Sequence, residues 1–151
     1  MKRKYIIDGN NLIGKIPKLW NMQKKDKQSS RIGIVFQLER YFHQKKIGVS
    51  LHFDGHPNEA IKGKGIKITY SENTTADNKI KDEISITDNP KLITVVSSDQ
   101  NVLDFARVNS CTIIKSEDFA REMNKNDNFE DEEKIAKSIS NNEMKKLFGI
   151  E

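Results

Sequence analysis

Short apolar runs recur along the chain at intervals that suit strands separated by helices. Five runs carry the strand pattern, and they are Tyr5 to Ile7, Val49 to Phe53, Ile66 to Tyr70, Leu92 to Val96 and Thr112 to Ile114. Residues with helical spacing lie between them, at Ile32, Val35, Phe36, Leu38 and Phe42, at Ile80 and Ile84, and at Val102, Leu103 and Ala106. Strands that alternate with helices are typical of a parallel sheet covered on both faces. We therefore predict an α/β fold with a central parallel sheet of about five strands flanked by helices.

Two stretches lack a regular pattern and are predicted to be loops. Residues 56–65 connect the second and third apolar runs, are too short for an ordinary crossover helix, and contain Gly63 and Gly65. Residues 15–30 contain Pro17 and several lysines without strong periodicity. We expect this second stretch to form a loop or lid beside the end of the first strand.

The composition becomes polar after Met123, which suggests a boundary. We predict one domain over residues 1–123, followed over residues 124–151 by a polar linker and a C-terminal helix that packs on the same domain. Ser140 to Glu143 has the pattern of a capping box, and the apolar residues of the helix are Met144, Leu147 and Phe148. A helix that binds a partner is the alternative.

The cysteine content and the apolar pattern restrict the location of the protein. Cys111 is the only cysteine, which excludes an internal disulfide and a Cys/His zinc site and favours a reducing compartment. The first apolar run ends at Asp8, too early for a signal peptide, and no run reaches the ~20 residues of a membrane span. We expect a cytoplasmic protein with no membrane partner.

Charge is distributed unevenly along the chain. The net charge is +4, but residues 1–70 carry +10 and residues 71–151 carry −6. A basic half can attract a polyanion, and an aromatic side chain among cations suits single-stranded RNA, with no preference for DNA evident. The candidate RNA-binding residues are Lys15, Lys18, Lys24, Lys25, Lys27, Arg31 and Trp20. The alternatives are solvated surface charges and, for Trp20, a place in a small satellite core.

Four aspartates stand where the ligand site of an open parallel sheet is expected. Asp8, Asp54 and Asp99 follow the first, second and fourth apolar runs, and Asp77 stands where the loop after the third run becomes a helix. Carboxylates that converge raise one another's pKa unless a cation neutralises them, and oxygen ligands favour Mg²⁺ or Mn²⁺. Such an ion can activate water to attack a phosphodiester. Each aspartate also has a structural alternative, as a turn former or a helix N-cap.

Polar residues beside these aspartates can support the same chemistry. Amides and hydroxyls can orient a water or bind phosphate, or they can serve only in turns, and the candidates are Asn10, Asn11, Asn78, Ser97 and Ser98. The histidines offer an alternative, cleavage of RNA by acid–base catalysis without metal, but the sequence pairs none of them; they are His43, His52 and His56.

Four motifs follow one another along the chain, and they are Tyr5-Ile6-Ile7-Asp8-Gly9-Asn10-Asn11-Leu12, Phe53-Asp54-Gly55, Thr75-Ala76-Asp77-Asn78 and Val96-Ser97-Ser98-Asp99. In this order they resemble the YacP-like branch of the NYN domain family, relatives of the PIN-domain nucleases. The resemblance implies a single PIN-like domain, an acidic pocket that binds Mg²⁺ or Mn²⁺, and endonucleolytic cleavage of RNA. In the YacP branch it further implies mRNA decay associated with translating ribosomes.

The resemblance also implies roles for particular residues. The family's metal-site acids correspond to Asp8, Asp77 and Asp99, with Asp54 and Asn11 as lesser members. Many PIN nucleases add a glutamate from the helix after the first strand. Here the only acid well inside that helix is Glu39, near its far end, so one or two metal ions remain compatible with the pattern.

Three classes of function are therefore compared. The first is a metal-dependent endoribonuclease that cleaves single-stranded RNA by attack of a metal-activated water. The second is a non-catalytic module that binds RNA or the ribosome. The third, a phosphatase or nucleotide-binding enzyme, is disfavoured because Gly63-Lys64-Gly65 lacks the spacing of a phosphate loop.

Overall fold

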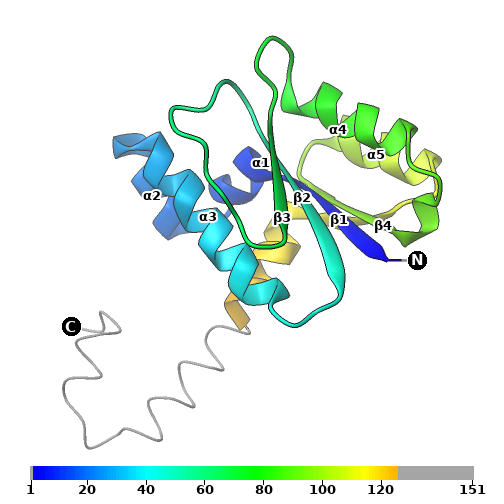
Figure 1. The fold of residues 1–151 in the computed structure, drawn as a ribbon, viewed down its shortest axis with the longest axis horizontal. Coiled ribbons are helices and arrows are strands. Elements are labelled where there is room, and N and C mark those ends of the chain that lie inside the picture. Colours follow the sequence, from blue (N-terminus) through cyan, green and yellow to red (C-terminus); the bar gives the residue numbers. More distant parts are fainter. Residues whose placement is uncertain (1, 126–151) are drawn as a thin grey trace, which may run out of the picture. The chain divides into compact units, whose positions relative to one another are not determined.

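A parallel sheet forms the centre of the computed structural model, which describes residues 2–125 (Figure 1). The five strands pair in the order β3-β2-β1-β4-β5, and every pair is parallel. Their bounds are β1 (Arg3–Asp8), β2 (Ile47–Phe53), β3 (Ile66–Tyr70), β4 (Ile93–Ser97) and β5 (Thr112–Lys115). Each strand corresponds to one predicted apolar run, so the predicted fold class is confirmed.

Helices occupy both faces of the sheet, as predicted (Figure 1). They are α1 (Gly9–Gly14), α2 (Pro17–Lys25), α3 (Lys27–Phe42), α4 (Ala76–Ser85) and α5 (Gln100–Val108), with a 3₁₀ turn at Pro90–Leu92 and further helical residues at 116–125. Tyr5 of β1 packs edge-on against Phe42 of α3, with ring centroids 5.1 Å apart. The next residue, Ile6, faces the other way and joins a buried cluster with Ile80 of α4 and Val102 of α5. This alternation along β1 places α3 on one face and α4 and α5 on the other.

The predicted loop at residues 15–30 is wrong, because the chain forms α2 and the start of α3 there. Pro17 lies in the first turn of α2, where its missing N–H costs nothing. Asp26 caps α3 by accepting the Gln28 N–H at 3.1 Å. Leu19 is the one buried residue of α2, and it packs so closely on Gly33 that a Cβ there would lie 2.6 Å from the leucine side chain. A helix with one buried residue has no apolar stripe for a sequence pattern to detect.

The buried stripe of α3 also differs from the predicted one. Ile32 and Phe36 were expected on the core face, but they are 49% and 66% exposed. The stripe instead includes Arg31, Val35 and Leu38, which are all buried. It lies one residue, or about 100°, from Ile32 and Phe36 around the helix.

The connection between β2 and β3 contains no helix, as predicted, although the two strands are parallel neighbours. Residues of α3 hold this loop. The Gln28 side-chain amide donates to the Glu59 carbonyl at 3.1 Å, and a Cβ at Gly63 would lie 3.3 Å from Val35. The loop is therefore packed along α3 rather than formed as a crossover.

The ends of the chain leave one prediction open. Contacts divide the chain into two units, Met1–Ala120 and Arg121–Glu151, and the first of them holds the whole sheet. The predicted linker and C-terminal helix lie, apart from residues 124–125, outside the described residues, so the boundary after residue 123 stays a prediction. Within residues 2–125 no helix is long and apolar enough to cross a membrane.

Candidate active site

The order of strands reverses beside β1, and this point locates the candidate active site. The chain places β2 and β3 on one side of β1 and β4 and β5 on the other. In open parallel sheets, ligands bind at the carboxyl ends of the strands where this reversal occurs. Asp8 ends β1 and Ser97 ends β4, so the two side chains flank the reversal.

Asp8 is a buried carboxylate, with only 2% of the residue exposed. One oxygen accepts the Asn11 N–H at 3.4 Å and caps α1, and the other lies 3.2 Å from the Ser97 hydroxyl. Burial, together with the negative charges of Asp54 and Asp99, raises the pKa of Asp8 to about 6 against the opposing effect of the hydrogen bonds from Asn11 and Ser97. The site therefore holds a desolvated carboxyl group in a fixed position.

Asp77 and Asp99 meet at the same edge of the sheet. Asp99 caps α5 by accepting the Asn101 N–H at 2.8 Å, whereas Asp77 lies in the first turn of α4, which Thr75 caps. Burial and a hydrogen bond to Asp99 raise the pKa of Asp77 to about 7. The same hydrogen bond lowers the pKa of Asp99. The pair therefore shares one proton near neutral pH.

Asp8, Asp77 and Asp99 together form the acidic group of the site. Asp54 is close enough to affect their charges, and it also makes a structural contact. One of its carboxylate oxygens accepts the Ala76 N–H at 2.8 Å, at the start of α4. Its own N–H donates to the Asn10 side chain at 2.8 Å. The charge of Asp54 contributes to the raised pKa values of Asp8 and Asp77. Asp54 thus anchors α4 as well as adding negative charge.

The side-chain oxygen of Asn11 connects the start of α1 to the end of β4. It accepts from the Ser98 N–H at 2.9 Å and the Ser98 hydroxyl at 2.8 Å, and it lies 3.1 Å from the Ser97 hydroxyl. Ser97 in turn accepts the Asp99 N–H at 3.1 Å. These contacts bring Asn11, Ser97 and Ser98 to the acidic group. Asn78 instead donates to Thr74 at 2.9 Å and helps to order the start of α4.

The donor set fits a hard divalent cation, although it is not preassembled. Within the described part of the chain, no group of three His, Cys, Asp or Glu side chains is arranged to hold a metal ion. Burial and, to a lesser extent, neighbouring negative charge nevertheless raise the pKa values of Asp8 and Asp77, and a cation would relieve the repulsion between these charges. Mg²⁺ usually keeps several waters and uses only one or two carboxylates. The residues could therefore hold such an ion together with water or a phosphate.

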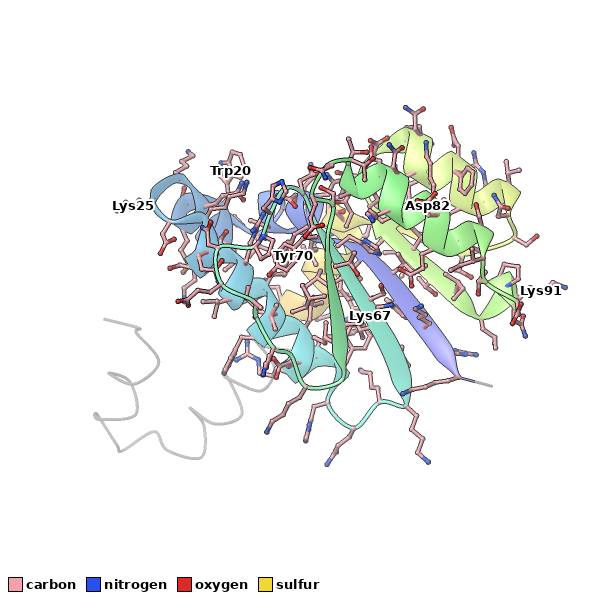
Figure 2. The ribbon with its side chains drawn as sticks, turned by 45° about the horizontal axis from the view of Figure 1, so that its top comes forward. Trp20, Lys25, Lys67, Tyr70, Asp82 and Lys91 are labelled. Carbon is pink, nitrogen blue, oxygen red and sulfur yellow. The ribbon has the colours of Figure 1, made fainter. Side chains whose placement is uncertain are left out.

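The predicted basic residues lie on the segment that leaves the carboxyl end of β1. The five lysines are exposed, and they are Lys15, Lys18, Lys24, Lys25 and Lys27. Trp20 is 44% exposed, with the Lys24 ammonium 5.6 Å from its ring centroid. The Trp20 and Lys25 side chains project outward from α2 (Figure 2). This surface combines cations with an exposed aromatic ring.

Arg31 was expected on the same surface, and that expectation is wrong. The residue is 2% exposed, and its guanidinium donates to the carbonyls of Asp54 and His56. It lies on the buried stripe of α3, which the sequence pattern placed one position away. Arg31 therefore cannot contact an RNA backbone in this structure.

A polar cluster that sequence reasoning missed lies beneath the site. His52 is buried, and its Nε2 lies 2.7 Å from Oε1 of Glu83. The same oxygen accepts the Ser50 hydroxyl at 2.7 Å, and Oε2 of Glu83 pairs with Lys4. These contacts lower the pKa of Glu83 to about 2, against the effect of burial. Ser50 and His52 at alternate positions of an apolar strand were the one available signal. The other histidines stand apart, with His43 at the end of α3 and His56 exposed in the loop.

Known protein structures share the fold of this chain. Two crystal structures of Rae1 (YacP) from Bacillus subtilis are similar. A tryptophan-to-leucine mutant has a TM-score of 0.73 and 20% identity over 91% of this chain and 83% of that one. The other structure has a TM-score of 0.71 and 17% identity over 96% and 87%. No curated protein sequence matches the chain. The sequence profile of the YacP-like NYN domain matches residues 5–148, and the chain belongs to this family.

Proposed function

We propose that the protein is a metal-dependent endoribonuclease that cleaves single-stranded RNA, with mRNA as the natural substrate. The observation that carries the proposal is the meeting of Asp8, Asp77 and Asp99 at the strand-order reversal, with two pKa values raised toward neutrality. Membership of the NYN family supports nuclease-type activity on RNA. Perturbed carboxyl groups at a ligand-binding edge are typical of catalytic sites.

The acidic side chains have separate roles in this proposal. Asp8 is the fixed ligand, because Asn11 and Ser97 hold both of its oxygens. Asp77 and Asp99 would hold the cation as ligands once their shared proton is lost. When bound, Mg²⁺ or Mn²⁺ supplies Lewis acidity to a water and to the scissile phosphate. Asp54 acts mainly by holding the start of α4.

Asn11 is the residue best placed to bind the substrate phosphate. Ser98 fixes the oxygen of its side-chain amide through two hydrogen bonds. The rotamer of the amide is therefore set, and its nitrogen is left to donate elsewhere. A donor at this edge can bind a phosphate oxygen without adding charge to the acidic group.

The exposed residues of α2 and its flanks bind the RNA strand. Lysines neutralise phosphates, and an exposed aromatic ring stacks on a base that is not paired in a duplex. The pairing of Trp20 with Lys24 provides both contacts side by side. This arrangement favours single-stranded RNA. In the YacP-like family the RNA substrate is expected to be bound to a translating ribosome.

A second candidate is a non-catalytic module that binds RNA or the ribosome. One observation favours it: residues 2–125 contain no preassembled group of three metal ligands. Such a module would keep its affinity for RNA or ribosomes when divalent ions are chelated. Its binding would also survive changes in the acidic group.

A comparison of Asp8→Asn with Asp82→Asn tests the proposal. Asp82 is exposed on α4, so its substitution is matched in chemistry but lies outside the acidic group. Calorimetric titration with Mn²⁺ and cleavage of a single-stranded RNA, with and without translating ribosomes, are measured on both variants and the wild type. We expect Asp8→Asn alone to lose metal uptake and cleavage. Wild-type binding to RNA or ribosomes, with neither uptake nor cleavage in any condition, would instead support the module.

A further inference from the structure

Arg31 is a buried charge at the back of the candidate active site. It is 2% exposed, and its Nε finds no hydrogen-bond partner within residues 2–125. Removing a guanidinium from water is unfavourable unless hydrogen bonds and partners compensate for the lost hydration. The groups that the guanidinium contacts are therefore the ones that its burial can hold in place.

Two aromatic rings support the guanidinium from β2 and β3. Its central carbon lies 5.1 Å from the ring centroid of Phe53 and 5.3 Å from that of Tyr70. The two rings are neighbours, with centroids 5.8 Å apart. Tyr70 lies between β3 and α3 (Figure 2), which agrees with these distances. Cation–π contacts with desolvated groups therefore fix the position of the guanidinium.

The guanidinium donates to the turn that follows β2. Nη2 lies 2.5 Å from the Asp54 carbonyl, and Nη1 lies 3.1 Å from the His56 carbonyl. Between these two residues, Gly55 has a φ of +84°, a conformation that favours glycine. The planar fork of an arginine can bridge two carbonyls at once, which the single ammonium of a lysine cannot do with the same geometry. Arg31 thus clamps both sides of a glycine turn.

The same turn holds the segment that leads into α4. The Gly55 N–H donates to the Ser71 hydroxyl at 2.9 Å, and the Gly55 carbonyl accepts the Glu72 N–H at 2.9 Å. The Asp54 carboxylate accepts the Ala76 N–H at 2.8 Å. Ala76 is the first residue of α4 and Asp77 is the second. A continuous set of contacts therefore runs from the buried arginine to the helix start that presents Asp77.

We infer that Arg31 is a positioning residue for the candidate active site. Its guanidinium fixes the Asp54–His56 turn, and the Asp54 carboxylate then fixes the start of α4 and with it Asp77. The inference rests on the proposed function where it treats Asp77 as a metal ligand. The role in fixing α4 depends only on the contacts, so the two parts can be tested separately.

The test compares Arg31→Met and Arg31→Lys with Arg40→Met. Arg40 lies on the same helix but is exposed, so it controls for the substitution itself. Amide hydrogen exchange is followed by NMR at Gly55, at Ala76 and at Ala106 in the last turn of α5, and Mn²⁺ affinity is measured by calorimetry. In Arg31→Met we expect faster exchange at Gly55 and Ala76 with Ala106 unchanged. We also expect Mn²⁺ affinity to fall roughly tenfold, as outer-shell changes do.

Arg31→Lys should have exchange rates and a Mn²⁺ affinity between those of the wild type and Arg31→Met. If Arg31→Met does not fold, Arg31→Lys provides the test. Unchanged exchange at Ala76 in the folded variants would overturn the inference, and so would an equal increase at all three amides. If the wild type takes up no Mn²⁺, the proposed function fails. The exchange at Ala76 still decides whether Arg31 positions α4. Unchanged Mn²⁺ affinity alongside faster exchange at Ala76 would overturn the link from α4 to the site.

Discussion

The carboxyl groups of Asp77 and Asp99 are hydrogen-bonded to each other between the starts of α4 and α5. Asp77 is half-buried and takes the proton, since its pKa is raised to about 7 while that of Asp99 is lowered. The negative charge of Asp99 disfavours ionisation of Asp77, so without a cation the second carboxylate forms only as the pH rises above about 7. In the metal-free protein a proton therefore occupies the role that we assign to the metal.

Metal binding should accordingly release protons and weaken as the pH falls. Asp8, with a pKa of about 6, and Asp77, with a pKa of about 7, are protonated below these values, and a cation must displace the protons. We expect the Mn²⁺ affinity to fall by about tenfold per pH unit for each proton displaced, between about pH 7 and pH 5. Calorimetry in buffers with different ionisation enthalpies measures the protons released. An affinity that does not change over this range would contradict the assignment.

Replacing Asp8 with asparagine should stabilise the metal-free protein. The folded pKa of about 6 lies above the ordinary value of 3.8, so the folded state binds this proton more tightly than the unfolded state. The contribution of Asp8 to the unfolding free energy is therefore greatest below the ordinary pKa and is lost as the pH rises through 6. Asparagine is also a good N-cap, so the cap of α1 survives.

Thermal unfolding in a chelator measures this effect. We expect a higher Tm for Asp8→Asn than for the wild type at about pH 7.5, with a gain of at most roughly 3 kcal/mol. The difference should shrink towards pH 4, where the carboxyl group is protonated. A wild type that is the more stable protein at neutral pH without metal would show that burial of this charge is compensated elsewhere.

Asp54 should respond differently to asparagine and to alanine. Its carboxylate accepts the Ala76 N–H, and an asparagine oxygen can accept the same hydrogen bond. We expect Asp54→Asn to keep most of the cleavage rate and Asp54→Ala to lose about 1 kcal/mol of stability together with activity. Urea unfolding and single-turnover cleavage measure the two quantities. Equal loss of cleavage in both variants, without loss of stability, would make Asp54 a direct metal ligand.

The sequence was sufficient where local rules determine the structure. Asp8 and Asp99 were correctly placed at one edge of the sheet because Asp8 ends β1 and Asp99 lies two residues after β4, and the carboxyl ends of parallel strands share an edge. It was not sufficient for α2, because this helix buries only Leu19 and has no apolar stripe. It was not sufficient for Arg31 either, because a charged residue is not recognised as part of a buried stripe from its sequence pattern. The contact between His52 and Glu83 joins residues 31 positions apart, which no local pattern specifies.

The aromatic residue of α2 should contribute to RNA affinity but not to metal uptake. Trp20 is exposed beside Lys24, so its loss removes a stacking surface without disturbing the acidic group. We expect Trp20→Ala to weaken binding of a single-stranded RNA by roughly 1–3 kcal/mol, as loss of one base–aromatic stack does, with unchanged Mn²⁺ affinity. Phe36→Ala is the matched control, because Phe36 is an exposed aromatic residue on α3.

The lysines of α2 should determine how strongly this binding depends on salt. Each lysine that neutralises a phosphate releases counterions, so the slope of log K against log salt is negative. Its magnitude should fall by about 0.7 for each lysine removed. We expect Lys24→Gln and Lys25→Gln to lower the slope, and Lys46→Gln, which lies just before β2 at the opposite edge of the sheet, to leave it unchanged. Filter binding of a short unstructured RNA over a range of salt concentrations gives the slope. Equal slopes for all three variants would mean that the RNA does not cross α2, and the path to the acidic group would have to follow another surface.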